Sequence, residues 1–481
     1  MFRNTKDTNR QSYFVSIKKG KPMNQTRKLT LREGFLAFSN PDMLHGPIWN
    51  SMVLFAIPIF LSSLFQSLYS MVDSLIVGHA LGENAYAAVG AGATVCELFI
   101  VFATGVGIGM SMVIARYFGA ADTDNMKKSS TACVVIGLVF SVLGTCFGLF
   151  FLKDILILLN TPAEIFEDAY RYAFIIILNI FACFFYNMFC GMLKALGNSF
   201  IPLLYLIFSS VLNIILDLIF VLILHRGVSG VAEATVLAQI SSALLSGFYI
   251  LKRCPSLVPE KRHLSIEWNL YKEILLTSVS MGLMNAIVML GTLILQFAIN
   301  TLGTLTIVAH TAARKLFSLG ILPVGSLCSS VSMFVSQNYG AKQIDRILKA
   351  LKYSHIFDIV YALIITVLYY FFSKEAMGLL TGSDNPEVLA SGFRYLVFSG
   401  PFYSVLGVLV SVRYALQAIG SKILPILASV IELVGKAIFT FLFVPKFGYW
   451  AVIFCEPLIW CAMTVELVLS FYLNKEIRSR G

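Results

Sequence analysis

Residues 56–93 read AIPIFLSSLFQSLYSMVDSLIVGHALGENAYAAVGAGA, and this stretch decides the class of fold. It is apolar over a length that can span a membrane, yet it carries one acid, Asp73, and one proline, Pro58. A polar break at 82–84 separates it from a second apolar run. A carboxylate inside a membrane helix costs roughly 2.5–3.5 kcal/mol on insertion scales, so such residues usually serve a function. Asp73 is therefore the first candidate functional residue.

The rest of the chain repeats this apolar pattern. Of its 481 residues, 58% are hydrophobic and only 13% are charged, whereas soluble proteins carry about 25% charged residues. Runs of about 20 apolar residues are typical of spanning helices, while the strands of a membrane β-barrel alternate in polarity. We therefore predict an all-α integral membrane protein with twelve transmembrane helices, at 49–78, 85–114, 129–151, 165–190, 201–224, 230–251, 273–300, 304–331, 350–372, 387–412, 423–444 and 449–473.

The net charge of +10 does not indicate a nucleic-acid partner, because the basic residues follow the predicted topology. Of 36 lysines and arginines, the predicted outer loops hold only Lys153, Arg226, Lys374 and Lys446. This asymmetry predicts a multi-pass protein of the plasma membrane, the inner membrane of a bacterium, with both termini in the cytoplasm. Residues 1–47 are expected to form a basic cytoplasmic segment near anionic lipid, with a short interfacial helix at 29–38.

An internal repeat divides the chain into halves. SMVIARYFGAADTDNMKK at 111–128 resembles SMFVSQNYGAKQIDRILK 221 residues later, and LKALGNSFIP at 193–202 resembles LQAIGSKILP at 416–425. Two halves with an even number of spans share one orientation, a common transporter plan with the substrate path between them. We expect an N-terminal six-helix lobe at 48–251, a cytoplasmic loop at 252–272, a C-terminal six-helix lobe at 273–473 and a cytoplasmic tail at 474–481.

The repeat separates the duplicated scaffold from the chemistry. Asp73 falls opposite Ile294, and Asp217 falls opposite Ile438 or Thr440, depending on the offset. A carboxylate needed only for folding would be expected in both halves, so the single copies favour a functional interpretation of both acids.

Polar residues in three spans of the first half fall on common helix faces. Residues four or seven apart share a face of a helix, and the sequence contains three such sets: Gln66, Tyr69 and Asp73; Asn213 and Asp217; Thr235 and Gln239. At 1.5 Å per residue, the two acids and the threonine lie roughly 10 Å below the outer surface. Two adjacent carboxylates cannot both stay charged cheaply in a low-dielectric site. The set therefore predicts a site for a proton or for Na⁺, which prefers oxygen ligands, unless the acids only bond neighbouring helices.

The remaining polar residues of the spans have more ordinary interpretations. Glu97 could line the substrate path or pack between helices, and Asn187 could face a cavity. Glu432 and Lys436 are four residues apart and can neutralise each other. Arg314 and Lys315 are expected to pair within the bundle, His310 to be a satisfied polar residue, and Glu456 begins the last span beside Pro457. Nine cysteines without a CxxC pair indicate neither a zinc site nor disulfides. We expect no cofactor.

In the order and spacing of its motifs, the chain resembles the MATE (multidrug and toxic compound extrusion) transporters. The resemblance covers about residues 48–473 and rests on Pro58, Gln66 and Asp73 with VGHALG, on ARYFGA and SQNYGA, on LKALGNSFIP, and on NIILD followed by GVAEATV. It implies a V-shaped pair of lobes that exports organic, often cationic, compounds in exchange for Na⁺ or H⁺.

The resemblance also implies roles for particular residues. It implies a coupling-cation site at Asp73, Asn213, Asp217 and Thr235, with Gln66 and Asn187 nearby, and a hinge at Pro58. Some branches of the family carry an acid in the seventh span, but the corresponding SMGLMNAIVMLG at 280–291 has none. No cation site is therefore expected in the second lobe, where Glu456 does not clearly replace that acid. We expect a monomeric transporter of small organic molecules, not an enzyme.

Three other functions fit less well. A lipid-linked precursor flippase of the same wider superfamily would be expected to have a larger cationic cavity and often extra spans. A membrane prenyltransferase needs aspartate-rich motifs, whereas NIILD supplies one aspartate. Transporters of the other large twelve-span superfamily carry a basic Gly-Asp motif between the second and third spans, and ARYFGAADTDNMKK differs from it.

Overall fold

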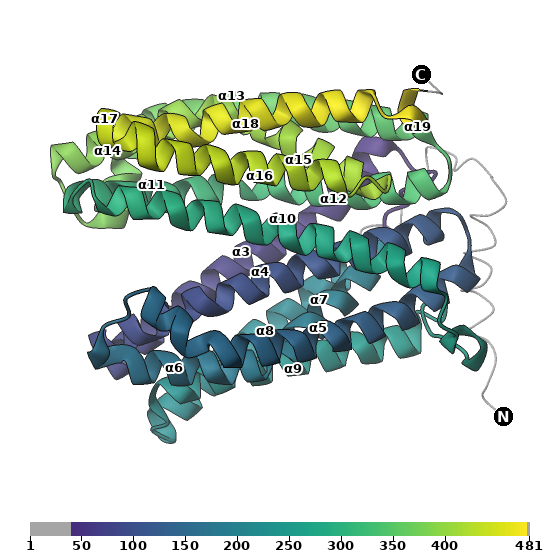
Figure 1. Ribbon diagram of the computed structural model, residues 1–481, viewed down its shortest axis with the longest axis horizontal. Coiled ribbons are helices and arrows are strands. Elements are labelled where there is room, and N and C mark those ends of the chain that lie inside the picture. Colours follow the sequence, from purple (N-terminus) through teal and green to yellow (C-terminus); the bar gives the residue numbers. More distant parts are fainter. Residues whose placement is uncertain (1–39, 479–481) are drawn as a thin grey trace, which may run out of the picture. The chain divides into compact units, whose positions relative to one another are not determined.

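The computed structural model describes residues 40–478, all within one compact unit, and every regular element among them is a helix (Figure 1). The predicted interfacial helix at 29–38 lies outside the described residues. Within residues 40–478, ten helices are long and apolar enough to cross a membrane. Two further pairs of helices, bent by 47° and 44° at short breaks, bring the number to twelve if each pair is one span. The predicted class of fold, twelve spans in an all-α membrane protein, is confirmed.

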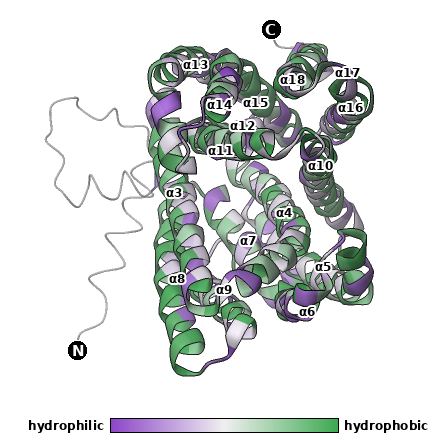
Figure 2. Ribbon diagram, turned by 90° about the vertical axis from the view of Figure 1, so that its left-hand side faces the viewer, coloured by the Kyte–Doolittle hydropathy of each residue, from purple (hydrophilic) through white to green (hydrophobic). Residues whose placement is uncertain are grey.

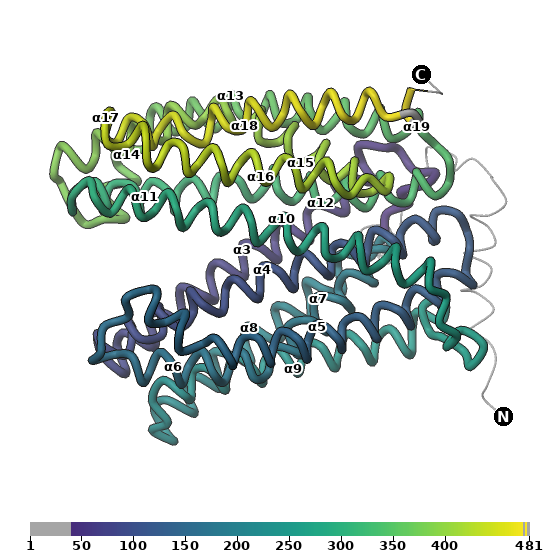
Figure 3. Tube along the Cα trace, viewed as in Figure 1, coloured from purple at the N-terminus to yellow at the C-terminus, as the bar shows by residue number. Residues whose placement is uncertain are grey.

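The helices pack as two lobes of six spans, whose paths can be followed in Figure 3. The first lobe consists of α3 (Ile48–Leu81), α4 (Glu83–Gly119), α5 (Thr123–Leu158), the bent pair α6 (Ala163–Leu178) and α7 (Ile180–Ala195), α8 (Phe200–Leu218) with the π-helical turn η1 (Ile219–Ile223), and α9 (Gly227–Arg253). The short helix η2 (Lys261–Leu264) lies in the connection to the second lobe.

The second lobe repeats this order. It consists of α10 (Trp268–Asn300), the bent pair α11 (Thr304–Gly320) and α12 (Leu322–Gly340), α13 (Ile344–Thr381), α14 (Pro386–Ser399) joined through η3 (Gly400–Phe402) to α15 (Tyr403–Ala418), α16 (Ile423–Ile438) with the π-helical turn η4 (Phe439–Phe443) and α17 (Val444–Phe447), and α18 (Tyr449–Tyr472). The short helix α19 (Lys475–Arg478) follows.

The backbone itself carries the internal repeat. Left-handed residues occur at matching places in the two halves, 221 to 223 positions apart: Gly82 and Gly303, Ala121 and Lys342, Gly197 and Gly420, and Gly227 and Gly448. A π-helical turn also interrupts α8 and α16 at matching places. The pseudo-symmetry seen in the sequence motifs is therefore a property of the fold.

The outward faces of the helices are apolar. Long runs of exposed leucine, valine, isoleucine and phenylalanine cover α5 and α13, among them Leu138, Val142, Phe147, Leu363, Val367 and Phe371. Figure 2 shows the same predominance of hydrophobic residues around the helices. Such a surface suits lipid rather than water.

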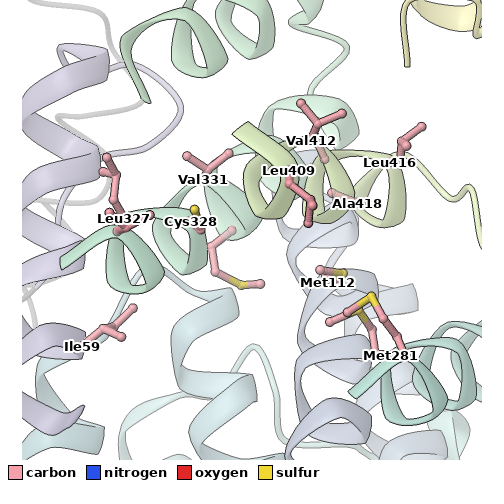
Figure 4. Close-up of a cluster of buried hydrophobic side chains, with 14 of the residues drawn as sticks. Ile59, Met112, Met281, Leu327, Cys328, Val331, Leu409, Val412, Leu416 and Ala418 are labelled. Atoms are coloured by element: carbon pink, nitrogen blue, oxygen red, sulfur yellow. The ribbon is translucent and has the colours of Figure 1, made fainter. Parts of the chain in front are cut away.

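The lobes meet where α3, α8 and α10 begin, the face that the charge distribution predicts to be cytoplasmic and that we call the inner face. A continuous apolar core joins α3, α4 and α10 to α12 and α15, as Figure 4 shows for Met112, Met281 and Val331. The Gln337 side chain of α12 donates a hydrogen bond of 2.8 Å to the Ala195 carbonyl of α7, across the two lobes. Arg116 forms an ion pair of 2.8 Å with Glu273, also between lobes.

Two glycines allow the closest approach between the lobes. A side chain at Gly119 in α4 would overlap the backbone of Gln337 in α12, and a side chain at Gly340 would overlap the backbone of Arg116. These positions are 221 residues apart, so the crossing is itself pseudo-symmetric. Only glycine fits at either position without moving a helix backbone.

Candidate functional site

Two helices of the first lobe, α3 and α8, bring buried oxygen atoms together. Asp217 on α8 is fully buried, and neither of its carboxylate oxygens accepts a hydrogen bond from any described residue. Oδ1 of Asp73 on α3 and Oδ1 of Asn213 on α8 are likewise buried without a partner within residues 40–478. Buried acceptors without donors are rare in folded proteins and costly. Four such atoms in three neighbouring side chains indicate a site that is complete only with a ligand.

The side chains are oriented so that the acceptors stay free. The carboxyl groups of Asp73 and Asp217 are adjacent. The Asn213 amide donates through Nδ2 to the Thr235 hydroxyl at 3.5 Å, while the Thr235 hydroxyl donates to the Val231 carbonyl at 3.1 Å. The amide nitrogen is thus turned toward α9, and Asn213 Oδ1 remains unpaired. The set offers only oxygen lone pairs, the chemistry that suits a proton or a hard cation.

A local change of helix type follows directly after Asp217. The α-helix α8 ends at Leu218 and continues as the π-helical turn η1. Such turns inside helices frequently occur at functional sites. The sequence motif NIILD identified the acid but gave no signal for this turn.

A cavity of about 330 Å³ lies beside Asn213 and Thr235, at the junction of the two lobes. Asn213 and Thr235 form part of its wall together with four other predicted residues, namely Gln66, Tyr69, Asn187 and Gln239. The second lobe contributes Ser329, Ser332 and Met333 from α12 and Tyr414 from α15. The size and the mixed polar and apolar wall suit a small organic molecule.

The sequence analysis did not single out Lys194, although it lies in the motif LKALGNSFIP. Lys194 is the one charged residue among the described residues that line the cavity, and it makes no ion pair with any of residues 40–478. It belongs to the last turn of α7, toward the inner face. A lysine in a span was the available signal, but the sequence does not say which way the side chain points.

Two predicted site residues lie apart from this cluster. Glu97 on α4 is exposed and is not part of the cavity wall. Pro58 is buried inside α3, which runs as one helix from Ile48 to Leu81. Because proline has no N–H, it leaves the helix one hydrogen bond short. The bond that is missing is the one to the Leu54 carbonyl, four residues before Pro58.

A further buried acid escaped the sequence analysis. Asp358 on α13 is fully buried, and neither of its oxygens has a hydrogen-bond partner among the described residues. It packs against Gly407 of α15 and is not part of the cavity wall. No group of three or more histidines, cysteines, aspartates or glutamates in the described part of the chain could hold a metal.

Three of the charged residues predicted to pair within the second lobe do so, namely Glu432, Lys436 and Arg314. Lys436 on α16 lies 3.0 Å from Glu432 and 3.3 Å from Glu456 on α18. Arg314 on α11 also pairs with Glu456. Lys315, expected to pair as well, is exposed and forms no ion pair with the residues described.

Comparison with known proteins gives three concordant findings. The MatE family model matches residues 58–219 and again 281–442, which repeats the internal symmetry. A curated relative, the probable multidrug resistance protein YoeA of Bacillus subtilis, is 28% identical over 399 residues, covering 81% of this chain and 85% of the relative. The multidrug export protein MepA of Staphylococcus aureus is 20% identical over 430 residues, covering 88% and 94% of the two chains.

Solved structures agree on the fold. One described as an outward-facing multidrug resistance MATE transporter of the MOP superfamily superposes with a TM-score of 0.83 at 23% identity, covering 94% of this chain and 99% of the other. A MATE transporter in a bent conformation gives 0.82, again at 23% identity, over 91% and 96% of the two chains.

Proposed function

Because the chain belongs to the MATE family of multidrug efflux transporters, we propose that it is an antiporter that exports organic compounds in exchange for H⁺ or Na⁺. Transporters of this family need no cofactor. The single observation that carries the proposal is the set of buried oxygens without donors on Asp73, Asn213 and Asp217. A bound cation or proton satisfies these atoms, with Thr235 completing the set.

Helix α3 can couple cation binding to substrate binding, because it contributes residues to both sites. The same helix carries Asp73 at the cation site and Gln66 and Tyr69 in the cavity wall. Without a cation, the adjacent carboxylates of Asp73 and Asp217 repel each other. A bound cation removes this repulsion and draws α3 toward α8, which changes the cavity wall and weakens substrate binding. A ligand shifts a conformational equilibrium only through such a difference in affinity between states.

The hinge proposed at Pro58 fits this scheme. The break in hydrogen bonding at Pro58 lies toward the inner end of α3, while Asp73 lies in its outer half. A helix with one missing bond can bend there at low cost. Cation binding at Asp73 would thus swing the segment that carries Gln66 and Tyr69.

The cavity wall refines the expected charge of the substrate. The resemblance to the family implies cationic compounds, yet the charged residue in the wall is Lys194. Asp73 and Asp217 are not part of this wall, but Asn213, four residues before Asp217 on α8, is. A compound with a basic group near Asn213 and an acidic group near Lys194 matches these two places in the wall. We propose that such two-ended compounds are exported better than simple organic cations.

The remaining features of the proposal concern topology and assembly. We propose that both termini face the cytoplasm, that the protein works as a monomer, and that the contacts at the inner face belong to an outward-open state. A lipid-linked precursor flippase remains the alternative. Twelve spans and a cavity wall with one charged residue among the described residues weigh against it.

The test is efflux of a fluorescent organic cation from proteoliposomes, with Na⁺ and pH gradients imposed separately. We expect one gradient to drive efflux in the wild type, and Asp73→Asn and Asp217→Asn each to abolish it while the purified protein keeps its thermal midpoint. Asp358→Asn is the matched control because it also removes a buried, unpaired carboxyl, but away from the cavity. Full gradient-driven efflux by Asp73→Asn would refute the assignment.

A further inference from the structure

The charged cluster of the second lobe occupies the place that the candidate cation site has in the first lobe. In the repeat, Lys436 corresponds to Asn213 and Thr440 to Asp217, both 223 residues on, which is the offset between Gly197 and Gly420 directly before the two helices, α8 and α16. Glu456 corresponds to Thr235 at the offset of 221 that relates Gly227 to Gly448. Different residues thus stand at equivalent positions.

Contacts in the two lobes support this correspondence independently of the sequence. Asn213 contacts Thr235 in the first lobe, and Lys436 contacts Glu456 in the second. Asp217 is adjacent to Asp73, and the Thr440 hydroxyl donates to the Ile294 carbonyl at 3.3 Å, where Ile294 is the residue opposite Asp73. The same pairs of positions meet in both lobes.

The surroundings of the Lys436 ammonium resemble the coordination of a small cation. Its Nζ atom lies 3.0 Å from Oε1 of Glu432, 3.3 Å from Oε1 of Glu456 and 3.2 Å from the Thr292 hydroxyl. Lys436 is 1% exposed, and both glutamates are 5% exposed. Two carboxylates and a hydroxyl on three helices therefore surround one buried positive charge.

The two clusters differ in whether their buried charges are balanced. In the second lobe, the ion-paired residues balance, because Glu432 and Glu456 are matched by Lys436 and Arg314 without a ligand. In the first lobe, Asp73 and Asp217 have no ion pair with any described residue. A buried carboxylate needs a counter-charge or a proton.

We propose that the second lobe keeps a cation site of the duplicated fold and that the tethered ammonium of Lys436 permanently fills it. The lobe then exchanges no ion, and the transporter carries its mobile cation in the first lobe alone. Removing the ammonium opens the second site to a small monovalent cation or a proton. The groups facing the site are Arg314 and His310 on α11, Tyr395 on α14, Arg413 on α15 and Thr292 on α10.

The test measures Na⁺ binding and proton uptake by the purified full-length protein. The background is Asp73→Asn/Asp217→Asn, which disables the first-lobe site. With Lys436 present, we expect no radiolabelled ²²Na⁺ to bind and no proton uptake by the cluster near neutral pH. Lys436→Asn, which copies Asn213 of the first lobe, should gain one equivalent of bound Na⁺ or of proton uptake. Because both first-lobe acids are already replaced, the result does not depend on whether the first lobe holds the coupling site.

The matched control is Glu432→Gln/Lys436→Asn, which removes one charge of each sign and should gain no cation. If the Lys436→Asn protein can be purified in folded form only in high Na⁺ or at acidic pH, this dependence of folding on the cation also supports the site. A folded Lys436→Asn protein that gains neither Na⁺ nor a proton would overturn the proposal. So would a Lys436→Asn protein that neither Na⁺ nor acid rescues while the control variant folds.

Discussion

Asn213 links the two carboxylates to the cavity, because it lies beside Asp217 in the candidate site and also forms part of the cavity wall. Its amide nitrogen donates to the Thr235 hydroxyl, so its oxygen is free to act as a neutral ligand. Replacing it therefore changes the cation site without changing its charge.

Asn213→Ala should weaken binding of the coupling cation roughly 10- to 150-fold, since a polar contact to a charged group contributes about 1.5–3 kcal/mol. Isothermal titration of the purified protein with the cation that drives efflux measures this. Gln296→Ala removes a half-buried amide of α10 that bonds Asn300 and serves as the control. An unchanged affinity in Asn213→Ala would exclude this side chain as a ligand.

Lys194 should decide which substrates bind. Lys194→Ala should reduce affinity for a compound with both an acidic and a basic group by about 10-fold or more, and leave a simple cation unaffected or bound more tightly, because charge-assisted contacts are strong in a buried cavity. Lys194→Arg should retain most of the affinity. Fluorescence titration with a matched pair of probes, with Lys446→Ala as control, decides the point. Equal losses for both probes would point to a packing role.

At the scale of helices, the crossing of α4 and α12 fixes how closely the lobes approach at the inner face. Gly119 and Gly340 lie there against backbone atoms of the opposite helix. Gly90 in α4 and Gly325 in α12 have open space where a side chain would project. The same substitution can therefore be made at crowded and open sites of the same two helices.

Gly119→Ala should push the helices apart at a cost of about 1–3 kcal/mol, as is usual for overpacking. We expect a lower thermal midpoint and faster labelling of Cys190, a residue of the cavity wall, by a thiol reagent applied from the inner face. Gly90→Ala should change neither quantity. Identical behaviour of the two variants would mean that the crossing is not the inner closure.

At the scale of the whole molecule, the ion pair of Arg116 and Glu273 joins the first lobe to the second, and the Tyr117 hydroxyl donates to the same carboxylate at 3.2 Å. The Arg116 side chain is 13% exposed and that of Glu273 is 30% exposed. Such a half-buried pair can hold the inner face closed and still separate when the lobes move.

Glu273→Gln should raise the rate of Cys190 labelling from the inner face up to about fivefold, since partly exposed pairs are worth roughly 0.2–1 kcal/mol. The charge-reversed pair Arg116→Glu/Glu273→Arg should bring the rate back toward the wild-type value. Arg171→Ala breaks an exposed pair within one lobe and should have no effect. If Cys190 were labelled faster in Arg171→Ala as well as in Glu273→Gln, the effect would be a general loosening of the protein and not the loss of the contact between lobes.

The sequence predicts the helices and the repeat well because membrane spans require long apolar runs and because duplicated motifs keep their spacing. It also brings out Asp73 and Asp217, since a lone acid in an apolar run is conspicuous. It does not predict that Lys194 faces the cavity or that Lys436 meets Glu456. Spanning helices are apolar on most sides, so their periodicity does not reveal which face turns inward. Those contacts depend on how helices from distant parts of the chain are rotated.

The measurement that tests the central claim most directly is displacement of a bound fluorescent substrate by the coupling cation at equilibrium. We expect Na⁺ or acidification to weaken substrate binding roughly 5- to 150-fold in the wild type, the usual range of coupling between sites. The effect should vanish in Asp217→Asn and persist in Asp358→Asn. The proposed coupling site would be contradicted if neither Na⁺ nor acidification changed the substrate affinity of the wild type. It would also be contradicted if the cation still displaced the substrate from Asp217→Asn.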